Sequence, residues 1–289
     1  MTDTGSSVPR RQLGRHLRIA REQAGLGLEA AAHELEVSRT TMYRIETGGA
    51  AVRKADVLAM CKVYGVSDEM TEALIGLATQ TKTKGWWHAY GDAIPSWFEL
   101  YVGLEAAASR LRHWEPASFP GLLQTREYAT HLLRSHPDLP GQEVERRVEV
   151  RMERQHILRR RKPAAPQLEI ILDEVVLRRR APGMAGQLAH LHSVASSETA
   201  TIRVVPLTVE PNWALAGSNF VILDFPSTGL RTPEPTTIYS ESLTGAIYLD
   251  RPTEVAAYAK AWRALEALAL DPSRSADLIA MIAKECSDD

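Results

Sequence analysis

The sequence has 289 residues, of which 44% are hydrophobic and 24% charged, the composition of an ordinary folded protein with two domains. Its formal net charge of -2 excludes a protein that coats nucleic acid through overall positive charge, although a local basic face stays possible. No apolar run approaches the roughly 18 residues of a membrane helix, and the first twelve residues lack the apolar core of a signal peptide. We therefore expect a cytoplasmic protein with no membrane contact.

The first part of the chain has the pattern of a compact set of helices. Short segments with helical periodicity alternate with Gly or Ser breaks, such as Gly25, Gly65 and the helix-capping Ser67. They predict five helices, over 13–24, 28–35, 39–47, 54–64 and 68–79. A Thr/Lys-rich stretch follows, so we place the boundary of this all-α domain at 1–81 and the second domain at 82–289.

The second domain mixes helical segments with runs rich in β-branched residues. The helical segments are 98–115, 125–134, 141–161, 186–195 and, as a closing helix, 254–269. The strand-like runs are 167–172, 201–206, 219–224, 237–241 and 246–249. The expected fold class is therefore multidomain: a five-helix domain followed by an α+β domain with a mixed sheet.

Residues 25–48 have the spacing of a helix-turn-helix. Two short helices are separated by a tight turn, with the small Ala31 and Ala32 where the helices approach and Met42 and Ile45 in the shared core. This geometry projects the second helix into the major groove of DNA. Because helical hairpins are common, the spacing alone is a weak signal; Arg21 and Glu46 strengthen it.

With these two residues, the segment 13–64 resembles the lambda-repressor-like, or XRE, family of bacterial helix-turn-helix regulators. In that family an arginine of the first helix pairs with a glutamate that ends the recognition helix, which implies an ion pair of Arg21 and Glu46. Two positions depart from the family. Leu28 replaces a glutamine that often contacts phosphate, and Glu36 replaces a glycine of the turn, which requires a left-handed backbone at Glu36.

The resemblance implies which residues meet DNA. Arginine can bind guanine with two hydrogen bonds, and threonine can contact a thymine methyl, so the third helix has suitable chemistry; a solvated helix face is the alternative. The expected DNA-binding residues of this helix are Ser38, which also caps it, Arg39, Thr40, Thr41, Tyr43 and Arg44. Phosphate contacts are expected from Arg18, Arg53 and Lys54, together with Arg10, Arg11 and Arg15.

The second domain also resembles a known type of protein domain. The strings GWW, LEAAASRLRHWEP, PGLLQT, REYA, RMERQ, DRPTEV and SADLI, which start at residues 85, 104, 120, 126, 151, 250 and 275, resemble a C-terminal domain of unknown function. Many actinobacterial XRE regulators of the toxin–antitoxin-like type carry it and are encoded beside a small protein that they bind. The alternative is a small-molecule sensor with an aromatic pocket of Trp86, Trp87, Trp97 and Trp114, residues that core packing also explains.

Catalytic and metal-binding patterns are missing from the sequence. There is no His-Glu-x-x-His, Gly-x-Ser-x-Gly or phosphate-loop motif, and Asp173-Glu174 has no partner motif for a metal. Cys61 and Cys286 lack the paired spacing of a zinc site. We therefore expect no enzyme and no cofactor, but a transcriptional regulator that binds a double-stranded DNA operator and a small partner protein. A homodimer is expected, because one module makes too few base contacts.

Overall fold

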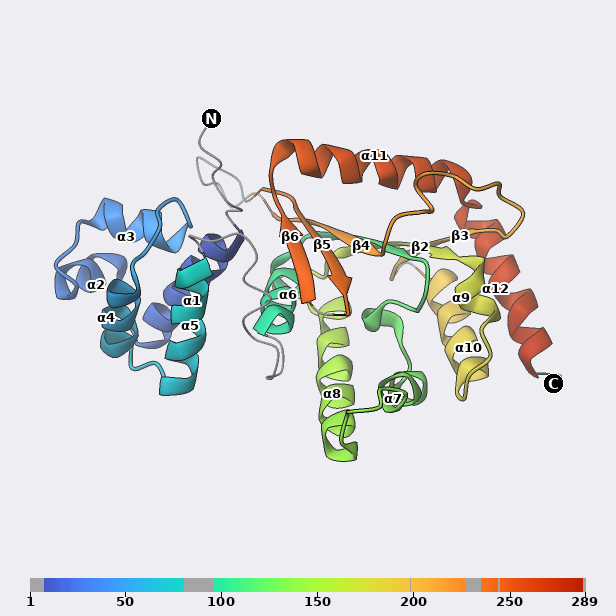
Figure 1. The fold of residues 1–289 in the computed structure, drawn as a ribbon, viewed down its shortest axis with the longest axis horizontal. Helices are drawn as coiled ribbons and strands as arrows, with labels where there is room; N and C mark the ends of the chain where they lie inside the picture. Colours follow the sequence, from blue (N-terminus) through green and yellow to red (C-terminus); the bar gives the residue numbers. More distant parts are fainter. Residues whose placement is uncertain (1–7, 81–95, 198, 227–234, 244, 288–289) are drawn as a thin grey trace. The chain divides into compact units, whose positions relative to one another are not determined.

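A computed structural model describes residues 8–80, 96–197, 199–226, 235–243 and 245–287 (Figure 1). These residues form two compact units, one within 1–104 and 242–252 and the other within 105–241 and 253–289. The domain boundary predicted at 81/82 borders the segment 81–95, which lies outside the described residues, and it stays a prediction. No described helix has the length and apolar character needed to cross a membrane.

Five helices make up the described residues 8–80, as the sequence predicts. They are α1 (Val8–Gln23), α2 (Leu28–Glu34), α3 (Arg39–Glu46), α4 (Lys54–Tyr64) and α5 (Asp68–Gln80). Their shared core contains Leu13 and Leu17 of α1, Ala31 of α2 and Met42 of α3, all with no exposed surface. The local signals explain the breaks: Gly25, with φ of +72°, follows α1, and Gly65, with φ of +67°, caps α4.

The C-terminal region contains both helices and strands. The helical elements are α6 (Ser96–Ala107), η2 (Gly121–Leu123), α7 (Arg126–Arg134), α8 (Gly141–Arg154), η3 (Gln155–Leu158), α9 (Glu174–Arg178), α10 (Met184–Ala195), α11 (Pro252–Leu268) and α12 (Pro272–Ser287). The strands are β1 (Arg110–Glu115), β2 (Gln167–Asp173), β3 (Thr201–Val205), β4 (Phe220–Asp224), β5 (Thr237–Ser242) and β6 (Gly245–Leu249). The predicted class, a helical domain followed by an α+β domain with a mixed sheet, is confirmed.

The sheet has the strand order β3-β2-β1-β4-β5-β6. Strand β1 pairs in parallel with β2 and antiparallel with β4, and β2 pairs in parallel with β3. Helix α11 lies on one side of the sheet, and α8, α9 and α10 lie on the other (Figure 1). Side chains are therefore buried on both faces of the sheet, as in β4, where Phe220, Val221, Ile222 and Leu223 are all buried.

The register assigns the side chains of β1 to the two faces. Trp114 is paired with Phe220, whose ring meets Tyr258 of α11 edge-on with centroids 5.1 Å apart. Trp114 therefore lies on the face that α11 covers. Since side chains alternate along a strand, His113 and Glu115 point to the opposite face, toward α8.

The helix predicted over 98–115 is wrong in its second half, because β1 begins at Arg110. Leu and Arg favour helices locally, but β1 gains hydrogen-bonded partners on both sides and buries Leu111 and Trp114 completely. The helix predicted over 141–161 also ends early, at Arg154, and continues as the short η3. Helix α12 was not predicted, so 254–269 does not close the chain.

Candidate nucleic-acid interface

Helix α3 separates its buried side chains from its exposed ones. Met42, Ile45 and Glu46 are buried. The predicted DNA-binding residues Arg39, Thr40, Thr41, Tyr43 and Arg44 are all exposed, as is Ser38 before the helix. The only carboxylate of the helix, Glu46, is thus turned inward, and the exposed face carries two guanidinium groups and no acid. Such a face suits the electronegative major groove.

The turn before α3 has the geometry that the sequence requires. Glu36 has a φ of +53°, the left-handed conformation predicted for it, and is the only described residue other than glycine with a positive φ. Ser38 then caps α3, since its Oγ accepts a hydrogen bond from the backbone N–H of Thr41 at 3.0 Å. The Ser38 and Thr41 hydroxyl oxygens lie 2.8 Å apart. These contacts hold the first turn of α3 in place.

Arg21 and Glu46 form the ion pair that the resemblance implies. Nε and Nη2 of Arg21 donate to the two carboxylate oxygens of Glu46 at 2.6 and 2.9 Å, and Nη1 donates to the carbonyl of Leu26 at 2.7 Å. The hydrogen bond to Glu46 is the main cause that raises the pKa of Arg21. The side chains are only 8% and 5% exposed, so the pair links α1 to the end of α3 inside the unit.

Gly14 of α1, which is not among the predicted site residues, allows the same two helices to approach closely. A Cβ atom at Gly14 would lie 2.4 Å from the carbonyl oxygen of Ile45 and 2.7 Å from that of Glu46. Glycine is therefore required at this contact. A single glycine inside an otherwise helical pattern is the signal that points to such a contact.

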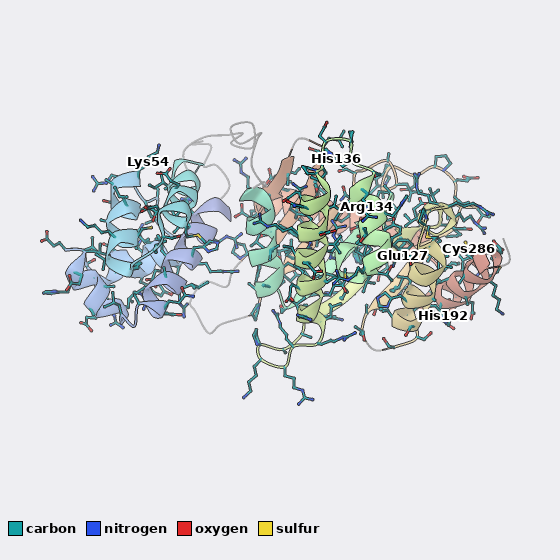
Figure 2. All side chains as sticks on the ribbon, turned by 90° about the horizontal axis from the view of Figure 1, so that it is seen from below. Lys54, Glu127, Arg134, His136, His192 and Cys286 are labelled. Carbon is teal, nitrogen blue, oxygen red and sulfur yellow. The ribbon has the colours of Figure 1, made fainter. Side chains whose placement is uncertain are left out.

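The expected phosphate contacts have different surroundings. Lys54 is exposed at the start of α4, where Figure 2 labels it. Arg18 and Arg53 are exposed but ion-paired, with Glu22 and Asp56, each at 2.9 Å. Of these three charges, that of Lys54 is the least compensated by a neighbour.

Other basic residues of α1 differ from the expectation. Arg11 is buried and its Nη2 donates to Asp250 at 3.2 Å, while Arg15 donates to the carbonyl of Gly103 at 3.3 Å. Arg11 is therefore unsuited to bind a phosphate, and the expectation that it contacts the DNA backbone is wrong. Its partner lies 239 residues away in the sequence. Leu28 at the start of α2 packs against the helical core, which explains why an apolar residue is tolerated there.

In the C-terminal region the structure brings together two strings that lie apart in the sequence. Gln155 Nε2, from RMERQ, donates to the carbonyl oxygens of Gly121 and Gln124, from PGLLQT, at 3.1 and 2.7 Å. Arg151 Nη1 donates to Gln124 Oε1 at 2.6 Å. The turn predicted at PGLLQT is the short η2, and Thr125 caps the helix that follows it.

The residues considered for a ligand pocket or a metal site have structural roles in the described part of the chain. Trp114 has no exposed surface and belongs to the core, whereas the side chains of Trp86, Trp87 and Trp97 lie outside the described residues. Asp173 accepts from the backbone N–H of Val175 at 2.9 Å and so caps α9. Glu174 accepts from the backbone N–H of Leu207 at 2.9 Å. No group of three or more potential metal ligands occurs among the described residues.

Comparison with known families agrees with this division of the chain. A model of a helix-turn-helix domain matches residues 12–74. A model described as "Domain of unknown function (DUF5753)" matches residues 98–281, more than half of the chain. The chain belongs to the DUF5753 family. A search of curated proteins found no match to it. The helix-turn-helix domain indicates DNA binding.

Proposed function

We propose that this DUF5753 protein is a sequence-specific transcriptional regulator of the XRE type, which binds an operator through α3 and a small partner protein through its C-terminal domain. The observation that carries the proposal is the exposed face of α3, where Arg39 and Arg44 project without any accompanying acid. The buried pair of Arg21 and Glu46 supports the XRE type, since it joins the same two helices as in that family. Regulation of a bacterial operator implies a cytoplasmic protein.

A homodimer is part of the proposal. One α3 offers only two arginines and a few hydroxyl groups to base edges, too little for useful discrimination. Two modules that read half-sites about one helical turn apart double these contacts. The proposal includes no catalysis or cofactor, because the sequence shows no catalytic motif.

Exposed apolar side chains of the C-terminal region support a protein partner. Leu207 and Trp213, on the connection between β3 and β4, are 54% and 57% exposed. The ammonium of Lys260 lies 5.7 Å from the ring centroid of Trp213. Exposed aromatic and aliphatic groups next to a positive charge suit a small partner with apolar and acidic side chains.

We expect Arg44 to determine sequence specificity. The Arg44→Ala variant should lose about 1–3 kcal/mol of binding free energy on the operator and little on random DNA, because the lost contact is to a base. Genome-wide mapping of bound sites would supply the operator, and fluorescence anisotropy would measure both affinities. Equal losses on the two DNAs would show that Arg44 contacts only phosphate.

Arg18→Ala is the matched control for a phosphate contact. It should weaken binding to all sequences and lower the slope of log K against log salt by about one unit. Because Arg18 is already paired with Glu22, DNA must compete with this carboxylate, so the loss in affinity should stay small. A specificity change in Arg18→Ala would contradict the assignment of α1 to the DNA backbone.

The two regions are expected to divide the binding functions. Residues 85–289 expressed alone should fold, fail to bind DNA and capture a small acidic or apolar protein from cell extract. Residues 1–81 should bind the operator weakly if the dimer contact lies in the second domain, since linked modules gain effective concentration. A tightly held metabolite in the larger fragment, with no protein captured, would favour the sensor alternative instead.

A further inference from the structure

A cleft lies between one end of the sheet and the last turns of α11, within the unit that contains 105–241 and 253–289. Its volume is about 260 Å³. Arg110 of β1, Glu169 of β2 and Thr201 of β3 line its floor, and Trp262 and Glu266 of α11 line its wall. Since pockets for drug-sized ligands have roughly 300–1,000 Å³, this cleft suits a smaller molecule.

The two sides of the cleft are tied together by hydrogen bonds. Just after α11, the backbone N–H of Leu270 donates to the carbonyl of Val204 in β3 at 2.9 Å. The N–H of Val204 donates to Ser275 Oγ of α12 at 3.0 Å. These bonds hold the end of α11 against the strand that carries Thr201 and Arg203, which also lines the cleft. The site is therefore preformed.

One guanidinium–carboxylate pair of the cleft is complete. Nε and Nη2 of Arg110 donate to the two carboxylate oxygens of Glu169 at 2.6 and 3.0 Å. The hydrogen bond to Glu169 is the main cause that raises the pKa of Arg110. The two charges compensate each other, so this pair presents no excess charge to a ligand.

A second pair, Arg203 and Glu266, is incomplete. Arg203 Nε lies 3.9 Å from Glu266 Oε1, too far for a hydrogen bond. Nη1 of Arg203 donates a long hydrogen bond, of 3.5 Å, to the carbonyl of Leu270. The two side chains are 27% and 43% exposed, so a solute can reach both. A donor and an acceptor thus stand side by side in the cleft without a hydrogen bond between them.

We propose that this cleft binds a small neutral polyhydroxy compound, such as a monosaccharide, with one hydroxyl group between Arg203 and Glu266. A hydroxyl can accept from a guanidinium and donate to a carboxylate at the same time. An oxygen atom about 2.8 Å from each partner can bridge two atoms that are 3.9 Å apart, so the separation fits one hydroxyl.

The rest of the cleft favours the same class of ligand. Its two arginines and two glutamates carry no net charge, so an anion would meet two carboxylates and a cation two guanidinium groups. Thr201 adds a hydroxyl at the exposed rim. Trp262, which is otherwise buried, supplies an apolar wall against which the C–H groups of a sugar ring can pack. The proposal does not depend on DNA binding or on a protein partner.

Thermal unfolding of the full-length protein tests this proposal. With glucose, galactose, mannose, ribose, N-acetylglucosamine or myo-inositol at about 10 mM, we expect at least one to raise the Tm by at least about 2 °C. Sucrose, a disaccharide too large for the cleft, controls for the general stabilisation of proteins by sugars. Acetate and methylamine test for charged ligands. If none of the six compounds raises the Tm, or if one of these controls raises it equally, the proposal is wrong.

Matched variants assign the effect to the cleft. Arg203→Met keeps the length of the side chain but removes its donors, and it should lower the affinity for the sugar at least tenfold, measured from the dependence of the Tm on sugar concentration. Arg263→Met should leave the affinity unchanged, because Arg263 is exposed on α11 and does not line the cleft. If Arg203→Met does not fold, Glu266→Met provides the test with the same expected loss. An unchanged affinity in the variant that folds, or an equal loss in Arg263→Met, would overturn the proposal.

Discussion

Glu46→Gln is expected to destabilise the helical region by about 3–5 kcal/mol, because it leaves the buried guanidinium of Arg21 without a counter-ion. The two side chains are 8% and 5% exposed, so water cannot replace the lost charge. Arg21 would keep its hydrogen bond to the carbonyl of Leu26, which does not compensate a charge. Because the pair joins α1 to the end of α3, operator binding should be lost at temperatures where the wild type still binds.

The distribution of tryptophan makes this measurement selective. All six tryptophans, at positions 86, 87, 97, 114, 213 and 262, lie outside residues 1–80. In urea unfolding of the full chain, circular dichroism follows both regions, whereas tryptophan fluorescence does not report directly on helices α1 to α5. We expect Glu46→Gln to lower the urea concentration at which the first dichroism transition occurs. The midpoint of the fluorescence transition should not change.

Glu22→Gln is the control for this ion pair. Glu22 also approaches Arg21, at 3.6 Å, but its side chain is 51% exposed. Exposed pairs contribute at most about 1 kcal/mol, so the loss should be small. Similar losses in Glu22→Gln and Glu46→Gln would contradict the view that burial of the pair determines its strength.

Gly14→Ala is the second change with a large expected effect. The new methyl group would lie 2.4 Å from the carbonyl oxygen of Ile45, a backbone atom that cannot rotate away. Helices α1 and α3 must then separate, at a cost of about 3 kcal/mol, and α3 must shift relative to the rest of the helical region. We expect the first dichroism transition to occur at a lower urea concentration. The affinity for the operator should decrease as well.

The same substitution at Gly186 should have the opposite effect on stability. Gly186 lies in α10, is exposed, and has no atom within 4 Å of an added Cβ. Gly186→Ala should therefore stabilise the C-terminal region by about 0.5–1 kcal/mol through helix propensity. A stability loss in Gly186→Ala, or none in Gly14→Ala, would show that the space around each glycine does not control the outcome.

The recognition helix was predictable from the sequence because its determinants are local. The spacing of Met42 and Ile45 sets the buried side of α3, and the remaining positions, including Arg39 and Arg44, must then face outward. The left-handed backbone at Glu36 was implied by the family resemblance, because that family often has glycine at this position of the turn. Local hydrogen bonds within helices and caps need no knowledge of distant residues, so a pattern within a few residues suffices.

Only the tertiary structure could decide features that depend on distant partners. Strand β1 looks helical by itself and becomes a strand because β2 and β4, about 57 and 110 residues later, satisfy its backbone. Arg11 is buried against Asp250, and Arg151 meets Gln124, for reasons that lie outside their own segments. Sequence periodicity indicates which side of a helix or strand is apolar, but not which other element packs against that side. The packing of elements against one another determines whether a basic residue is buried, ion-paired or available to a ligand.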